Sequence, residues 1–142
     1  MNDYKKPLPI VRDENRSYWQ ALKKEKVSFI SCVSCGQIRL YSFRKCPACG
    51  EEKHFWKTIP GTGTIWTIAK FHQVYFESFK DEVPYNVIVV QLDQGPKIYS
   101  NLIKNEEPIA QIGDRVEPVF DPVTDEVTLL KFRLILKCSD VN

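Results

Sequence analysis

The residues best equipped for chemistry in this 142-residue chain are four cysteines arranged as two pairs. Cys32 and Cys35 form one C-x-x-C motif, Cys46 and Cys49 form a second, and ten residues separate the motifs. Each motif is followed by a glycine, which can adopt the positive φ that turns backbone N–H groups toward the sulfur atoms. The pattern predicts two facing knuckles whose four thiolates bind one metal ion. Such a saturated site leaves no open position for substrate, which indicates a structural role.

Other uses of the four cysteines stay open on the residues alone. A redox-active C-x-x-C normally begins a helix within a thioredoxin-like alternation of strands and helices, and this region lacks that alternation. Iron fits the same kind of knuckle, as in rubredoxin-type sites. Disulfides are disfavoured if the chain works in a reducing cytosol. We therefore expect structural Zn²⁺, with iron less favoured. A segment this short buries little apolar surface, so metal binding should supply its folding free energy.

No other part of the sequence carries a recognisable catalytic motif. The fifth cysteine, Cys138, and the histidines His54 and His72 show no local pattern of a Cys-His pair. The chain has no G-x-S-x-G, no H-E-x-x-H and no phosphate-binding glycine loop. We therefore expect no catalysis by this chain alone, and no role is assigned to Cys138.

The composition limits the kinds of partner that the chain is expected to bind. The 20 basic and 18 acidic residues give a net charge of +2, too small for the one-sign field typical of proteins that bind nucleic acids or anionic membranes. The N-terminus lacks a signal-peptide hydrophobic region, and no run approaches the roughly 20 apolar residues that span a bilayer. These features predict a cytoplasmic protein without membrane contact.

A helix is predicted upstream of the cysteines, over residues 14–26, with Asp13 as its cap. Its apolar stripe consists of Tyr18, Trp19 and Leu22. This stripe either packs on the rest of the chain or docks on a partner, and Trp19 is the candidate contact residue. A strand over residues 27–32 then leads into the first knuckle.

Downstream of the second knuckle the sequence predicts only strands. Five strands within about 75 residues leave no room for a crossover helix, so the sheet should be antiparallel. Glycines at 61, 63 and 113 allow the coiling and bulges that close such a sheet into a five-stranded OB-like barrel. The predicted fold is therefore mainly β, with an N-terminal helix, a rubredoxin-like four-cysteine zinc ribbon and an OB-fold barrel. The expected boundaries are 1–27 for the arm and helix, 28–57 for the ribbon and 58–142 for the OB-fold domain.

One predicted connection, residues 72–85, is rich in aromatic residues and lies where OB barrels bind ligands. It carries Tyr75, Phe76, Phe79 and Tyr85, more than a solvated loop needs, so it either caps the barrel or meets a partner. Lys80 is its one cation beside three acids, and this charge repels a phosphate backbone. Single-stranded nucleic-acid binding is therefore the less favoured alternative.

Taken in order, several stretches resemble a known family. They are SYWQALKKEKVSFISCVSCG, CPACG, GTGTIWTIAKFHQ, PYNVIVVQLDQGPKIYSNL, IGDRVEPVF and TLLKFRL. This order is similar to that of the small zinc-ribbon and OB-fold proteins associated with thiolases and acyl-CoA metabolism. The resemblance runs from about residue 13 to residue 134, and the combination of motifs is more specific than any one of them.

The resemblance implies an accessory role. Members of this family resemble non-catalytic subunits that bind thiolase-superfamily enzymes, such as archaeal acetoacetyl-CoA thiolase with hydroxymethylglutaryl-CoA synthase. These subunits help to enclose the CoA ester. The family's metal ligands correspond to Cys32, Cys35, Cys46 and Cys49, and no catalytic residue carries over. A site for acyl-CoA would use aromatic walls and a few cations, and the candidates for lining it are Phe71, Tyr75, Phe76, Phe79 and Lys80.

Overall fold

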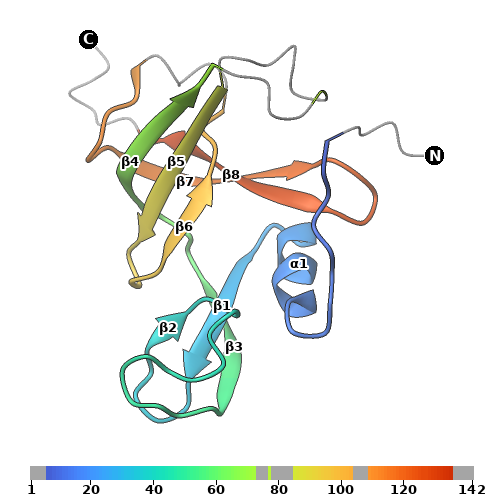
Figure 1. Ribbon diagram of the computed structural model, residues 1–142, viewed down its shortest axis with the longest axis vertical. Helices are drawn as coiled ribbons and strands as arrows, with labels where there is room; N and C mark the ends of the chain where they lie inside the picture. The colour runs from blue at the N-terminus through green and yellow to red at the C-terminus, as the bar shows by residue number, and fades with distance from the viewer. Residues whose placement is uncertain (1–5, 73–76, 78–84, 104–108, 136–142) are drawn as a thin grey trace.

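The computed structural model describes residues 6–72, 77, 85–103 and 109–135. Within these ranges the chain forms one helix and eight strands, divided between a small three-stranded sheet and a larger five-stranded sheet (Figure 1). No helix in the described ranges has the length and apolarity of a membrane-spanning segment. The predicted mainly β fold is confirmed.

The small sheet positions the cysteines. Strand β1 (Val27–Cys32) lies between β2 (Ile38–Arg39) and β3 (His54–Ile59), and both pairings are antiparallel. All six residues of β1 are buried, and the strand ends at the first cysteine of the first motif. The strand predicted over residues 27–32 is therefore confirmed, and it holds one end of the predicted metal site rigidly.

The large sheet is the predicted five-stranded barrel, with strand order β6-β5-β4-β7-β8 and antiparallel ladders throughout. Its strands are β4 (Gly63–Phe71), β5 (Tyr85–Leu92), β6 (Lys97–Ser100), β7 (Arg115–Pro122) and β8 (Thr128–Leu134). A β-bulge between Ile65 and Thr67 increases the local coiling of β4. At Gly63 a Cβ atom would lie only 2.5 Å from the carbonyl oxygen of Gln91, so the close approach of β4 and β5 requires glycine.

The barrel closes through a parallel contact that the sequence did not predict. Beyond β6, Leu102 forms a parallel bridge with Phe132 of β8. The Ile103 N–H donates to the Phe132 carbonyl at 3.0 Å, and the Phe132 N–H donates to the Asn101 carbonyl at 2.9 Å. Curling the sheet brings its first and last edges together, and their relative direction depends on the whole path of the chain rather than on any turn.

Helix α1 (Arg16–Lys23) is shorter than predicted, and Asp13 is not its cap. Asn15 occupies the N-cap position, but its side chain bonds the preceding arm, accepting from the Arg12 N–H and donating to the Ile10 carbonyl. Asp13 instead pairs with the Arg16 guanidinium at 2.6 Å. The cap prediction is therefore wrong, because Asp13 lies two residues before the N-cap position and its carboxylate pairs with the first residue of the helix.

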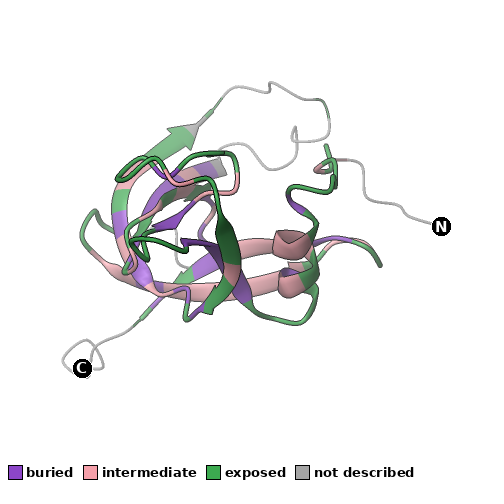
Figure 2. Ribbon diagram, turned by 90° about the horizontal axis from the view of Figure 1, so that it is seen from below, coloured by how far each residue is buried: buried purple, intermediate pink, exposed green. Residues whose placement is uncertain are grey.

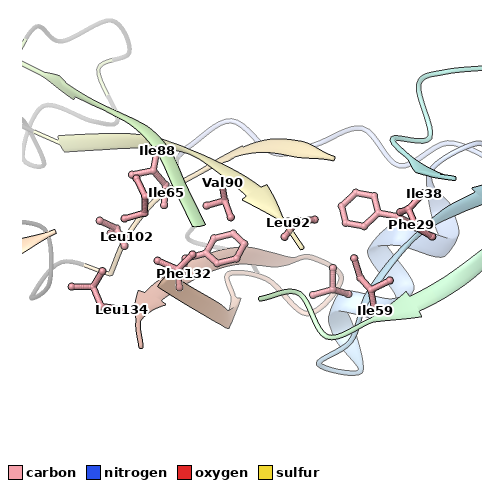
Figure 3. Packing of buried hydrophobic residues seen from close by; sticks show 12 residues of the cluster. Phe29, Ile38, Ile59, Ile65, Ile88, Val90, Leu92, Leu102, Phe132 and Leu134 are labelled. Carbon is pink, nitrogen blue, oxygen red and sulfur yellow. The ribbon is translucent and has the colours of Figure 1, made fainter. Parts of the chain in front are cut away.

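One hydrophobic cluster runs through both sheets. It joins Val27, Phe29, Ile38 and Ile59 of the small sheet to residues of the barrel that include Leu92, Val116 and Phe132 (Figure 3). Helix α1 packs against β1, β7 and β8, with Leu22 fully buried. Figure 2 shows the buried segments lying mostly along the strands, while the helix is largely intermediate in exposure. The small sheet is thus braced by the barrel and does not depend on its own few apolar residues.

Candidate metal centre

The four cysteine sulfur atoms converge at the open end of the small sheet. All four lie within 4.8 Å of one another, and Cys32–Cys49 and Cys35–Cys46 are each 3.6 Å apart, Sγ to Sγ. All four are free thiols, far beyond the disulfide bond length of about 2.05 Å. Zn–S bonds of about 2.3 Å place sulfur atoms about 3.8 Å apart at the corners of a tetrahedron. The four-cysteine cluster therefore fits one tetrahedral metal ion.

Two matching backbone turns hold the sulfur atoms. In the first turn the Gly36 N–H donates to the Cys32 carbonyl at 3.0 Å, and in the second the Gly50 N–H donates to the Cys46 carbonyl at 2.8 Å. Gly36 and Gly50 have φ values of 76° and 79°, the left-handed conformation that favours glycine. The two predicted knuckles are therefore present, and their glycines serve the expected conformational purpose.

Backbone N–H groups inside the knuckles favour the thiolate form. The N–H of Cys35, helped by that of Ser34, lowers the pKa of Cys32 to about 6, against the opposing effect of burial. Burial acts to raise the pKa of Cys46, but N–H groups of Cys49 and Ala48 lower it overall. A cluster that stabilises thiolates in the absence of a partner cation is well suited to a metal ion, which binds the deprotonated form.

The pKa of the fourth cysteine, Cys49, shows that thiols gathered without a cation oppose one another's ionisation. The Glu51 N–H acts to lower the pKa of Cys49, but the neighbouring sulfurs, Cys32 first among them, raise it to about 12. Four thiolates repel one another at these distances, so the cluster holds all of them charged only when a cation is present. The arrangement therefore couples metal binding to proton release.

Glu51 ties one knuckle to the other. Its carboxylate accepts from the Lys53 N–H at 2.9 Å and from the Ser34 hydroxyl at 3.1 Å. The Lys53 N–H, followed by Ser34, lowers the pKa of Glu51, so the carboxylate remains charged well below neutral pH. Such bonds around a metal site orient its ligands.

Trp19, the partner-contact candidate on α1, lies half-buried and packs edge-on against Tyr18 with ring centroids 5.0 Å apart. Its indole Nε1 is buried and has no hydrogen-bond partner. Tyr18 in turn contacts Phe29 at 5.7 Å and Tyr41 at 5.5 Å, and burial, reinforced by Tyr41, raises the pKa of its phenol. These rings fasten the helix to the small sheet.

The loop candidates cannot be placed. Tyr75, Phe76, Phe79 and Lys80 lie outside the described residues, and only the backbone of Phe71 is described, at the end of β4. Their part in ligand or partner binding stays a prediction.

The outer face of the barrel sheet carries aromatic side chains that sequence reasoning did not select. We define this outer sheet face by Trp66, Thr67, Val89, Lys97 and Tyr99. Tyr99 is 83% exposed, and the Lys97 ammonium lies 4.0 Å from the Trp66 ring centroid. The bulge makes both Trp66 and Thr67 face outward, while Ile65 and Ile68 pack inward. The three-residue spacing of those isoleucines within a strand was the signal available in the sequence.

Comparison with known proteins also identifies an OB-fold domain in this chain. The family model described as ChsH2, C-terminal OB-fold domain, matches residues 56–121. The solved Ltp2-ChsH2(DUF35) aldolase is similar with a TM-score of 0.79 and 25% identity, covering 91% of this chain and 100% of that chain. A DUF35-family structure from Sulfolobus solfataricus, with a TM-score of 0.59 and 11% identity over 87% of this chain and 86% of that chain, supports the fold alone.

Two relatives from other organisms match most of the chain. A probable enoyl-CoA hydratase alpha subunit of Thermomonospora curvata is 28% identical over 90% of this chain, which spans only 40% of that protein. A DUF35 domain-containing scaffold protein of Methanothermobacter thermautotrophicus is 31% identical over 67% of this chain and 71% of its own length. Because the chain is 31% identical to a DUF35 domain-containing protein and covers 71% of it, the chain belongs to the DUF35 family.

Proposed function

We propose that this chain is a non-catalytic accessory subunit that binds a thiolase-superfamily enzyme, of the thiolase or hydroxymethylglutaryl-CoA synthase type, and helps to bind its acyl-CoA. The observation that carries the proposal is the similarity to the whole of one chain of the Ltp2-ChsH2(DUF35) aldolase, whose name joins two components. The scaffold names of the archaeal relatives support the same role.

The chemistry of the chain supports an accessory role rather than an enzymatic one. Among the described residues, the four cysteines are the one cluster of at least three groups that could hold a metal. Four thiolates complete a tetrahedral shell and leave no position for a substrate or an activated water. In this proposal the reaction takes place on the partner.

The ion we propose is Zn²⁺, held by Cys32, Cys35, Cys46 and Cys49. Four soft sulfur ligands at tetrahedral spacing suit zinc, and zinc would supply structural cross-linking without redox chemistry. Metal analysis of protein purified from zinc- and iron-supplemented cultures tests the identity. One zinc per chain is expected, and an iron-thiolate absorption band would assign the site to iron instead.

Aromatic side chains would provide the contacts with the partner and the acyl-CoA. Trp19, the outer sheet face and the loop residues Phe71, Tyr75, Phe76, Phe79 and Lys80 are the candidates. Buried aromatic anchors supply much of the binding free energy in protein interfaces. The exposed Trp66 and Tyr99 support this proposal because they offer such anchors outside the barrel core.

Co-purification tests the proposal directly. The tagged chain, co-expressed with a thiolase-superfamily enzyme of the same organism, should retain that enzyme through gel filtration, and the chain alone should cleave no acyl-CoA. The paired variants Trp66→Ala with Tyr99→Ala, and Tyr75→Ala with Phe76→Ala, separate the sheet face from the loop. Lys131→Ala, on another strand, is the control. Thioester turnover by the isolated chain, abolished by chelation, would refute the accessory role.

Single-stranded nucleic acid remains a second candidate because of one observation. Trp66 and Tyr99 are exposed on the OB sheet with Lys97 beside them, and stacking surfaces of this kind bind bases. One lysine is a weak electrostatic footprint, so we rank this function lower. A fluorescent oligonucleotide whose anisotropy rises with added protein, and falls again with salt, would favour it.

A further inference from the structure

The residue that follows each C-x-x-C-G segment lies at the edge of the metal centre. Gln37 comes directly after the first segment and Glu51 directly after the second. The Gln37 carbonyl accepts from the Cys32 N–H at 3.0 Å. The Glu51 carbonyl accepts in the same way from the Cys46 N–H, at 2.9 Å. The two positions are therefore equivalent in the backbone, and each closes its own knuckle around the first cysteine of that knuckle.

The side chains at these two positions contact the opposite knuckle. The Glu51 carboxylate accepts from the Ser34 hydroxyl of the first knuckle at 3.1 Å. Oε1 of Gln37 accepts from the thiol of Cys46, in the second knuckle, at 3.4 Å. Among the described residues, Gln37 has the only side chain outside the cluster that bonds a cysteine sulfur. Gln37 thus connects the first knuckle to a metal-ligand candidate of the second.

The bond between Gln37 and Cys46 has to change when the cluster binds a metal. A ligating sulfur is a thiolate, which has no proton to donate and only accepts hydrogen bonds. The partial negative charge of a carbonyl oxygen beside it would then repel the sulfur. A glutamine amide carries its oxygen and its NH2 group on the same carbon, so a half turn of the amide replaces the acceptor by a donor.

No competing bond opposes this half turn. Within the part of the chain that the structure describes, the Gln37 side chain has no hydrogen-bond partner besides Cys46. The residue is exposed, whereas Cys46 is buried. The amide can therefore rotate while the sulfur keeps its place in the cluster. A carboxylate at position 37 could not make this exchange, because it accepts hydrogen bonds at both oxygens.

We propose that Gln37 is a positioning residue of the metal centre, whose side-chain NH2 donates to the Cys46 thiolate when the ion is bound. The first knuckle then holds a ligand of the second in both states of the site, through S–H···O without the ion and through N–H···S with it. The groups that bond metal ligands orient them, and removing one typically costs about 10–100-fold in metal affinity. The inference rests on the proposed metal site, but it requires neither zinc in particular nor the accessory role.

Cadmium-loaded protein tests the hydrogen bond directly. In the full-length chain loaded with ¹¹³Cd, an N–H···S–Cd bridge transmits a scalar coupling from the metal to the Gln37 side-chain protons. We expect this coupling together with couplings to the Cβ protons of all four cysteines. Couplings to the cysteines without one to Gln37 would overturn the inference and leave the metal centre intact. A chain that bound no cadmium would overturn both.

Two substitutions at position 37 separate the lost donor from an added charge. Gln37→Glu keeps the size of the side chain but replaces the NH2 donor by a second acceptor, and it should lose about 100-fold in Zn²⁺ affinity. Gln37→Met removes the donor without adding charge and should lose about tenfold. Competition with a chromogenic chelator at neutral pH measures both affinities.

Gln111→Glu is the matched control, because it makes the same exchange at an exposed residue outside the ribbon. Its zinc affinity should equal that of the parent. If Gln37→Met bound zinc as tightly as the parent, the loss in Gln37→Glu would come from charge repulsion alone, and Gln37 would not be a positioning residue. An equal loss in Gln37→Glu and Gln111→Glu would contradict the proposal as well, because it would show an effect of overall charge.

Discussion

The ribbon, formed by β1–β3 and the two knuckles, and the barrel, formed by β4–β8, reach a closed structure by different means. The barrel closes through backbone hydrogen bonds, with Leu102 and Phe132 joining its edges around fully buried side chains. The ribbon closes at the four cysteine sulfurs, two of which lie on exposed residues. Barrel closure thus rests on backbone hydrogen bonds around a buried core, whereas the ribbon ends in four thiols placed to bind a metal ion.

The shared core qualifies this contrast. Phe29 and Ile59 of the ribbon belong to the same cluster as Leu92 and Phe132 of the barrel (Figure 3). Loss of the ion should therefore destabilise the barrel through β1, and substitutions in the barrel core should disturb the positions of the metal ligands. A DUF35 protein built in this way can present a rigid surface made from two small units, neither of which needs a large core of its own.

The largest effect is expected from removing a metal ligand. Cys46→Ser should lose the ion and unfold the ribbon, because structural zinc sites contribute about 10 kcal/mol or more to folding in isolated fingers. Zinc content and ¹⁵N NMR spectra measure the two consequences. Ser34→Ala, which changes the facing knuckle without touching a ligand, is the control. If Cys46→Ser kept its full zinc content and gave unchanged spectra, the ribbon would not depend on its metal ligands, and the contrast with the barrel would be wrong.

Truncation of the shared core comes next. Phe132→Ala and Phe29→Ala each remove a fully buried ring and should each cost about 3–5 kcal/mol in the free energy of unfolding. Because both rings belong to one cluster, each variant should shift a single unfolding transition in urea. Arg133→Ala on the exposed side of β8 serves as the control. Two separate transitions, one per variant, would show that the ribbon and the barrel fold independently.

The junction between the two units should respond to a single methyl group. Gly61 has φ of 82°, and a Cβ there would lie 2.8 Å from Val27 Cγ2 and 3.1 Å from Pro118 Cγ. Gly61→Ala should therefore cost about 1–2 kcal/mol for the backbone conformation and a further 1–3 kcal/mol for the crowding. Gly113→Ala has a positive φ of 97° in open space and isolates the backbone effect. Equal losses for both variants in urea unfolding would show that the junction is not tightly packed.

The smallest effect is expected at an ion pair of the barrel. Arg115 donates to both oxygens of Asp93, at 2.7 and 2.8 Å, and this bond with the help of Thr62 holds the pKa of Asp93 below its usual value of 3.8. A carboxyl group whose pKa is lower in the folded than in the unfolded state stabilises the protein at pH values above its unfolded-state pKa. This stabilisation is lost as the pH falls through the folded-state pKa. Both side chains are partly exposed, so the contribution is at most about 1 kcal/mol.

Asp93→Asn tests this pH dependence. The variant should be less stable than the parent at pH 7, and the difference should shrink as the pH falls below about 4, because the parent then loses its own charge. Thermal unfolding between pH 2.5 and pH 7 measures it. Glu117→Gln, which breaks the exposed pair with Arg133, is the control. A difference that grows toward acidic pH would contradict the sign of the pKa shift.

Much of the fold was predictable because local rules governed it. The strand over residues 27–32 and the five antiparallel strands downstream of the second knuckle were expected from local pattern and short connections, and the structure has them. The cysteine knuckles were predictable for the same reason, since a C-x-x-C-G segment determines its own turn. The cap at Asp13 failed because the helix begins only at Arg16, whose guanidinium pairs with the Asp13 carboxylate.

The candidate site was also predictable from the sequence only in part. The sequence named all four cysteines, but it did not single out Trp66 and Tyr99, because a bulge rather than strict alternation turned Trp66 outward. Arg39 was not singled out either, although its side chain is buried and its Nε donates to the Phe43 carbonyl. Neither outcome is encoded in a local pattern of residue types.

The sequence by itself determined which atoms can hold a metal and where the chain turns, because chemical identity and short-range backbone geometry are written in consecutive residues. Only the tertiary structure decided that β8 meets residue 102 in parallel, that one core serves both units, and that the Arg39 side chain is buried. These features arise from contacts between distant segments, whose free energy depends on how the whole chain packs.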